Sequence, residues 1–197
     1  MLLYDSAESG NCYKARLLLS QLGVPFARVA VDTGSKEGRR ELLGDKNPAL
    51  RVPVLQLKDG KHLAESNAIL WYLAEGTAYA PDDRFDRAKA LQWMFFEQYD
   101  HEPYIAVIRH RTLHGHLDDY PDTVQRRERG YAALDAMEKH LGGRAFLVGD
   151  AYTVADIALY AYTHVAGEGG FELSRYPAIE AWLGRVAVQP GHVPITA

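Results

Sequence analysis

Cysteine is nearly absent from this 197-residue chain, in which Cys12 is the only one. A single cysteine excludes an internal disulfide and a dithiol redox site, and it fits a reducing compartment without requiring one. No run of about 18 apolar residues occurs, so no membrane-spanning helix is expected. The chain begins with neither a basic segment nor a long apolar one, so we expect no signal peptide and predict a cytoplasmic protein.

Neither sign of charge dominates the composition. The 22 Lys and Arg residues against 26 Asp and Glu residues give a net charge of −4. The basic residues are scattered, so the electrostatic footprint of a nucleic-acid-binding protein is missing. Hydrophobic residues make up 47% of the chain, which is ordinary for a globular protein and sufficient to bury a core without disulfides.

The first third of the chain alternates between strand and helix patterns. A short apolar strand at 2–4 precedes a helical pattern that begins near Cys12, and a second strand is predicted at 26–31. The two strands of such a βαβ unit are parallel. A hairpin around the Asp59-Gly60 turn and a helix beginning at Ser66 complete a βαβ–ββα order, which is typical of a thioredoxin-like domain.

The rest of the chain is predicted to contain a loop, a linker and a helical domain. Residues 32–47 are polar and contain three glycines, so we expect an irregular loop there. After residue 84 the pattern is helical throughout, with predicted helix starts at Phe85, Pro121, Thr153 and Pro177. We therefore predict an α+β thioredoxin-like domain at 1–77, a linker at 78–84, and an all-helical domain at 85–197. Thr153 and Asp156 have the spacing of a capping box, which is a structural device.

Ser9 lies in the turn between the first predicted strand and the first predicted helix. The N-terminus of a helix favours an anion through its free N–H groups and its dipole. A hydroxyl group there can donate one hydrogen bond, which would stabilise a bound thiolate and lower the pKa of its thiol. Serine is also a preferred helix cap, so a purely structural role is the alternative. Cys12 could be an activated nucleophile in the same turn, or a small packing residue, which is the interpretation that we favour.

Two further segments suit a peptide-like ligand. Val52 precedes Pro53, and its peptide group could pair with an extended peptide, although an ordinary proline at a strand start is the alternative. Ser66 begins a helix and offers a backbone N–H to a carboxylate, while the neighbouring Glu65 could accept an ammonium group. A plain helix start is the alternative for this pair.

These segments occur in an order and spacing that resembles the glutathione transferase superfamily over nearly the whole chain. The motifs are Ser9-x-Asn11-Cys12 with Lys14 and Arg16, Asn47-Pro48-x-x-Arg51-Val52-Pro53, Glu65-Ser66-x-Ala68-Ile69, Thr153-Val154-Ala155-Asp156, and Tyr176-Pro177-x-Ile179-x-x-Trp182. The chain departs from the family where Asn-Pro is usually followed by Gly-Lys, because Leu50-Arg51 stands there.

The resemblance implies an enzyme of the serine type, as in the theta, zeta and related bacterial classes, with glutathione as co-substrate and no metal. It implies that Ser9 is the catalytic residue that binds the glutathione sulfur, and that Asn11 shares this contact. Beta-class members use a cysteine that lies nearer to the position of Gly10 than to that of Cys12.

The rest of the implied glutathione site follows from the other motifs. Glu65 and Ser66 would hold the γ-glutamyl end of the tripeptide. Val52 would bind the cysteinyl part through its backbone, and Arg51 would contact a carboxylate.

The resemblance also implies a homodimer that acts in detoxification on a hydrophobic electrophile. The second substrate is expected between Ser9 and the long helix that begins at Phe85. Candidate lining residues are Tyr104, Ile105, Ile108, Arg109 and Arg111, and helical core packing is the alternative for each of them.

Two other functions stay open on the same scaffold. One is a glutathione-dependent peroxidase or disulfide reductase, which the sequence does not separate from a conjugating enzyme. The other is a non-catalytic module that binds a partner within a larger assembly.

Overall fold

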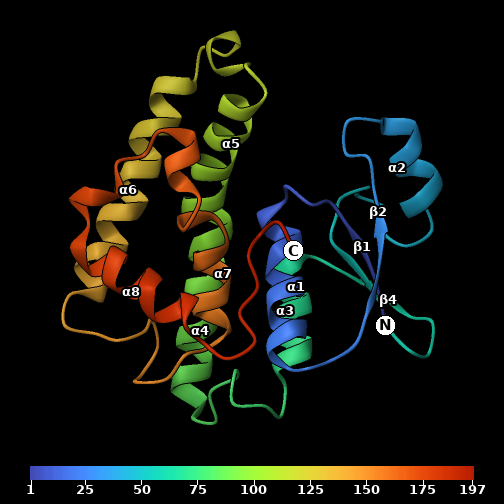
Figure 1. The fold of residues 1–197 in the computed structure, drawn as a ribbon, viewed down its shortest axis with the longest axis horizontal. Helices are drawn as coiled ribbons and strands as arrows, with labels where there is room; N and C mark the ends of the chain where they lie inside the picture. The colour runs from blue at the N-terminus through green and yellow to red at the C-terminus, as the bar shows by residue number, and fades with distance from the viewer. The chain divides into compact units, whose positions relative to one another are not determined.

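The computed structural model describes all 197 residues. Their contacts divide the chain into two units, one formed by Met1–Thr77 with Gln189–Ala197 and the other by Ala78–Val188 (Figure 1). The sequence predicts a helical domain that extends to residue 197, whereas in the structure Gln189–Ala197 pack with the first unit.

The first unit contains a four-stranded mixed sheet in the order β2-β1-β3-β4. In chain order its elements are β1 (Leu2–Asp5), α1 (Gly10–Gln21), β2 (Ala27–Ala30), α2 (Lys36–Leu43), β3 (Val54–Gln56), β4 (His62–Ala64) and α3 (Ser66–Ala74). β1 and β2 are parallel, whereas β3 is antiparallel to both β1 and β4. The predicted βαβ–ββα arrangement of a thioredoxin-like domain is thus confirmed.

Both faces of the sheet are covered by helices. Tyr4 of β1 and Val54 of β3 pack in one hydrophobic cluster with Leu43 of α2. Leu3 and Leu55 alternate with them along the strands and are fully buried on the opposite face. On that face α1 and α3 lie side by side (Figure 1).

The helix α2 corrects the expectation of an irregular loop at 32–47. Ser35 caps this helix by accepting a hydrogen bond from the N–H of Gly38 at 3.0 Å. Leu43 at its last turn is fully buried. The helix is stable in this context because its cap and its buried leucine outweigh the low helix propensity of Gly38.

The second unit is helical throughout. Its main elements are α4 (Arg84–Phe96), a π-helical segment (Glu97–His101), α5 (Glu102–Leu113), α6 (Thr123–Leu141), α7 (Val154–Thr163) and α8 (Pro177–Ala187). The long helix predicted from Phe85 onward is therefore continuous but contains a wide turn. Pro103 follows that turn and has no N–H to continue the α-helical hydrogen-bond ladder, which accounts for the change of pitch. None of the helices combines the length and the apolar character that spanning a membrane requires.

The predicted capping box of α7 is confirmed, and it does more than end a helix. The Asp156 carboxylate accepts hydrogen bonds from the backbone N–H of Thr153 and Leu147, both at 2.9 Å, and from Trp182 Nε1 at 2.9 Å. It is completely buried. One side chain therefore joins α7, the connector before it and α8.

The final segment, Gln189–Ala197, is held to the first unit by its alternate carbonyl groups. The carbonyls of Gly191, Val193, Ile195 and Ala197 accept hydrogen bonds from Ser20, Tyr13, Arg16 and Arg28, respectively, at distances of 2.6–2.8 Å. Gly191 is required at the first of these contacts, because it has a positive φ of 73° and an added Cβ would lie 2.8 Å from the Cα of Gln21.

Candidate functional site

The sheet topology brings the predicted site segments to one edge. Because β3 is antiparallel to both β1 and β4, the chain leaves β1 and β4 at the same edge at which it enters β3. Tyr4 pairs with Val54, and Val54 pairs with Ala64. The turn after β1, the segment before β3 and the start of α3 are consequently neighbours at that edge.

Ser9 is the N-cap of α1, so the capping role that the sequence suggests for this residue is confirmed. Its Oγ accepts a hydrogen bond from the N–H of Cys12 at 3.2 Å, and its carbonyl accepts one from the N–H of Tyr13 at 2.9 Å. A hydroxyl group can accept and donate at once, so the capping bond leaves the Ser9 proton available for donation. Capping and ligand binding are therefore compatible roles for this residue.

Cys12 is buried in the first turn of α1, and its Sγ accepts a hydrogen bond from the N–H of Ser6 at 3.4 Å. Burial raises the pKa of the Cys12 thiol to about 12, and the hydrogen bond with Ser9 opposes this only in part. The thiol is therefore protonated at neutral pH and enclosed in the core. Both properties support the packing role over a nucleophilic one.

The packing role predicts that the Cys12 thiol resists alkylation in the folded protein, because it is buried and protonated. Mass spectrometry after treatment with a thiol-alkylating reagent, with and without urea, tests this. Alkylation of the folded protein at the rate of the unfolded chain would contradict the packing role.

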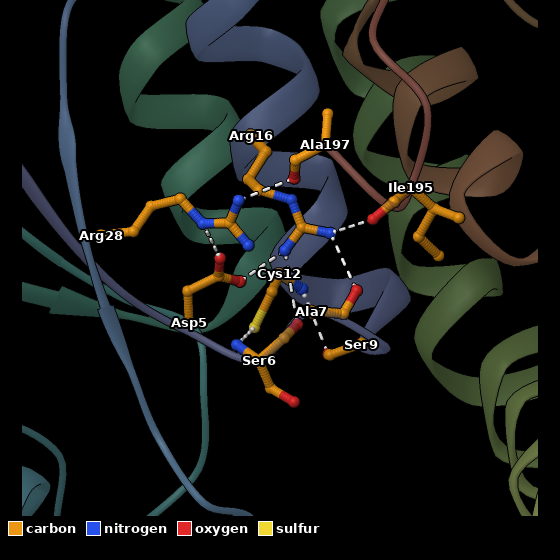
Figure 2. Close-up of polar contacts among 9 residues, drawn as sticks. All are labelled: Asp5, Ser6, Ala7, Ser9, Cys12, Arg16, Arg28, Ile195 and Ala197. Carbon is orange, nitrogen blue, oxygen red and sulfur yellow. Dashed lines mark hydrogen bonds and ion pairs between the residues drawn. The ribbon is translucent and has the colours of Figure 1, made fainter.

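The turn that carries Ser9 is anchored by an ion-pair cluster around the buried side chain of Asp5 (Figure 2). Asp5 at the end of β1 is 1% exposed, and its two carboxylate oxygens contact Arg16 Nη1 and Arg28 Nε, each at 2.5 Å. The Arg16 guanidinium also donates to the carbonyls of Ser6 at 3.3 Å and Ala7 at 3.1 Å. Arg16 thus fixes both residues at the start of the turn.

A second polar network joins the N-termini of α1 and α3. Lys14 Nζ lies 2.9 Å from Asn11 Oδ1, 3.3 Å from Ser66 Oγ and 3.4 Å from Asn67 Oδ1. Ser66 Oγ also donates to Asn11 Oδ1 at 3.2 Å. Two predicted site residues, Asn11 and Ser66, are therefore in direct contact.

Lys14 and Asn67 were not among the predicted site residues. The signal that could have found Lys14 is its spacing: it is three residues after Asn11, on the same side of the helix. Asn67 directly follows Ser66 and has no comparable signal.

Val52 and Arg51 lie just before β3. The peptide bond between Val52 and Pro53 is cis. Pairing of β3 with its neighbours begins at Val54, so the peptide groups of Val52 lie outside the sheet register. The Arg51 side chain is exposed, and its carbonyl accepts a hydrogen bond from Asn47 Nδ2 at 2.9 Å.

Glu65 has an unusual backbone conformation, with a φ of 67°. Its side chain is exposed and makes no capping hydrogen bond to α3. A non-glycine residue in this region costs about 1–3 kcal/mol, and such residues are concentrated at functional sites. The conformation therefore favours a functional role for Glu65 over a plain helix start.

The five candidates for the electrophile site lie in α5: Tyr104, Ile105, Ile108, Arg109 and Arg111. The two isoleucines are fully buried within the helical unit. The two arginines form ion pairs at 2.7 Å, one with Glu168 and one with Asp122. Core packing therefore accounts for the two isoleucines and ion pairing for the two arginines, whereas Tyr104 lines an open pocket of about 460 Å³ together with Gln125 and Arg129.

No group of three or more His, Cys, Asp or Glu side chains is arranged to hold a metal ion. The chemistry that the sheet edge offers is instead a hydroxyl donor, an amide, a buried ammonium and an exposed carboxylate. This set suits a zwitterionic peptide-like ligand with a thiol.

Two family models match this chain. Residues 8–75 match the family model of the glutathione S-transferase N-terminal domain, and residues 94–190 match that of the C-terminal domain. The chain therefore belongs to the glutathione S-transferase family.

Individual relatives can be aligned with nearly the whole chain. A crystal structure of a glutathione S-transferase from Pseudomonas fluorescens Pf-5 is 50% identical, covers 100% of this chain and 98% of its own, and has a TM-score of 0.96. The glutathione S-transferase-like protein LUC7 of a Fusarium species is 36% identical over 93% of this chain and 86% of its own length. The disulfide-bond oxidoreductase YfcG of Escherichia coli is 27% identical over 93% of this chain and 89% of its own length.

Proposed function

We propose that this protein is a glutathione transferase that binds glutathione at the sheet edge described above and activates its thiol for attack on an electrophilic small molecule. The observation that carries the proposal is the contact between Asn11 and Ser66, which joins the N-terminus of α1, beside the Ser9 hydroxyl, to the N-terminus of α3.

The γ-glutamyl and cysteinyl parts of glutathione each have a matching group in the site. The γ-glutamyl ammonium binds Glu65, and the γ-glutamyl carboxylate binds Ser66 at the N-terminus of α3, where the helix dipole is favourable. The cysteinyl backbone pairs with Val52 in the manner of an added strand, and Arg51 contacts a carboxylate. The sulfur lies at Ser9 and Asn11.

The reaction needs little from the protein beyond this arrangement. The Ser9 hydroxyl donates a hydrogen bond to the sulfur, which favours the thiolate over the thiol. The thiol proton passes to solvent, and a sulfur lone pair forms a carbon–sulfur bond with the electrophile. The displaced electron pair leaves with a leaving group or moves to an adjacent acceptor atom. Each unit by which the thiol pKa falls corresponds to about 1.4 kcal/mol of preferential binding of the thiolate.

A Glu65→Ala variant is expected to bind glutathione about 10- to 100-fold more weakly, because a hydrogen bond between charged groups contributes about 1.5–3 kcal/mol. Its free energy of unfolding should change by less than about 0.5 kcal/mol, since the side chain is exposed and caps nothing. Isothermal titration calorimetry with glutathione and urea unfolding measure the two quantities. Glu41→Ala, an exposed glutamate in α2, is the control. Equal affinity in Glu65→Ala and wild type would reject the proposed role of Glu65.

A glutathione-dependent disulfide reductase or peroxidase is the second candidate, favoured by the similarity to the disulfide-bond oxidoreductase YfcG. The same thiolate would then attack a disulfide or peroxide bond. Turnover of hydroperoxide and disulfide substrates, compared with turnover of an electrophilic aryl halide, separates the two activities. Glutathione binding without any turnover would instead identify a binding module.

The protein's oligomeric state, location and domain organisation are also part of the proposed function. We propose a cytoplasmic homodimer that acts in detoxification, with residues 1–77 as the glutathione-binding domain, 78–84 as a linker, and the helical residues from 85 onward completing the site of a hydrophobic electrophile. A sedimentation mass equal to that of one chain would contradict the dimer.

A further inference from the structure

Lys14 is the least expected member of the network at the start of α1. It is a lysine with 0% exposure, and its ammonium lies 2.9 Å from Asn11 Oδ1. A buried ammonium is costly unless it is hydrogen-bonded. Three of its partners, Asn11, Ser66 and Asn67, offer neutral oxygen atoms.

These contacts fix which way the Asn11 amide points. An ammonium group has three donors and no acceptor, so only the oxygen end of the amide can face Lys14. The Ser66 hydroxyl donates to the same oxygen at 3.2 Å. The reverse orientation would bring the amide NH₂ group against an ammonium group, donor against donor. The NH₂ end of Asn11 is therefore turned away from Lys14.

The direction of this NH₂ group matters because Asn11 is only two residues from Ser9 in the first turn of α1. A thiolate is stabilised by donors and destabilised by a facing carbonyl oxygen. An asparagine without a fixed orientation can present either end. Orientation of the amide consequently decides whether Asn11 helps or opposes a thiolate beside Ser9.

We propose that Lys14 is a positioning residue that locks the Asn11 amide with its NH₂ group toward the sulfur of bound glutathione. This inference rests on the proposed function. The same ammonium also contacts the Ser66 hydroxyl, so one buried cation couples the groups at the sulfur to those at the γ-glutamyl end. Lys14 itself does not touch the substrate.

The experiment is a double-mutant cycle on the thiol pKa of bound glutathione. Wild type, Lys14→Met, Asn11→Ala and the double variant are saturated with glutathione, and thiolate absorbance is titrated against pH. Methionine matches the length of lysine and removes all three donors. Lys61→Met, at a surface lysine of the β3–β4 hairpin that pairs with Asp59, is the matched control.

Lys14→Met is expected to raise the thiol pKa by about one unit, the effect of losing one hydrogen bond to a charged group. In the Asn11→Ala background the same substitution should produce no further shift, because Lys14 acts through Asn11. Lys61→Met should leave the pKa at the wild-type value. An unchanged pKa in Lys14→Met would overturn the proposal, as would a full shift in the Asn11→Ala background, which would show a direct electrostatic effect.

A second variant covers the case in which Lys14→Met does not fold. Lys14→Gln fills a similar space with a neutral amide that can face either end of the Asn11 amide, so it should raise the thiol pKa in a folded protein. An unchanged pKa in this variant would also overturn the proposal. Failure of the proposed function itself is distinguishable, because wild type would then bind no glutathione or leave its thiol pKa at the value of free glutathione.

Discussion

Ser9→Ala should lower kcat/KM for glutathione conjugation by about 10- to 100-fold. The variant loses the hydroxyl proton that stabilises the thiolate, and a hydrogen bond to a charged group is worth about 1.5–3 kcal/mol. The pH profile of kcat/KM should shift to higher pH, because the bound thiol then titrates closer to its ordinary pKa.

The control for Ser9→Ala must separate the lost cap from the lost donor. Ser35→Ala removes the same kind of cap from α2, where Oγ accepts from the N–H of Gly38. Both variants should lose about 1 kcal/mol of unfolding free energy, and only Ser9→Ala should lose activity. Wild-type turnover in Ser9→Ala would remove Ser9 from the mechanism and leave Asn11 as the donor to sulfur.

Asp156→Asn should destabilise the helical unit by about 3 kcal/mol or more. Burial raises the pKa of Asp156 to about 6, so the group is a carboxylate at neutral pH. Its two oxygens accept from Leu147 and Trp182 on one side and from Thr153 on the other. An amide has only one acceptor end, so its NH₂ group must face buried donors that lose their partner.

The unfolding midpoint in urea measures this effect. Asp135→Asn is a matched control, because Asp135 is exposed and accepts a hydrogen bond from the Tyr176 hydroxyl at 2.8 Å. This variant should lose less than about 1 kcal/mol. A similar loss in the two variants would contradict the account of Asp156 as the acceptor that joins α7 to α8.

Features with strong local signals could be predicted from the sequence. The Asp59-Gly60 turn, the capping box of Thr153 and Asp156, and the Pro177 start of α8 each depend on residues a few positions apart. The strand and helix order of the first unit follows from such signals and from the switch in hydrophobic period.

Features that depend on distant contacts could not be predicted in this way. The α2 helix is short, contains Gly38, and is held by packing of Leu43 against Tyr4 and Val54. The return of Gln189–Ala197 to the first unit depends on donors that lie far away in the sequence, such as Arg16 and Arg28.

The same distinction between local signals and distant contacts applies to the residues of the candidate site. The positions of Ser9, Val52 and Ser66 could be predicted because each begins or precedes a regular element. The contacts of Lys14 with Ser66 and Asn67 could not, because these residues are brought to it only when α1 packs beside α3.

The most direct test of the central claim is the thiol pKa of glutathione bound to the wild-type protein, measured by titrating thiolate absorbance of the saturated complex. The account predicts a pKa at least about one unit below that of free glutathione, because Ser9 and Asn11 both donate to the sulfur. Saturable binding with an unchanged thiol pKa, or no binding by calorimetry, would contradict it.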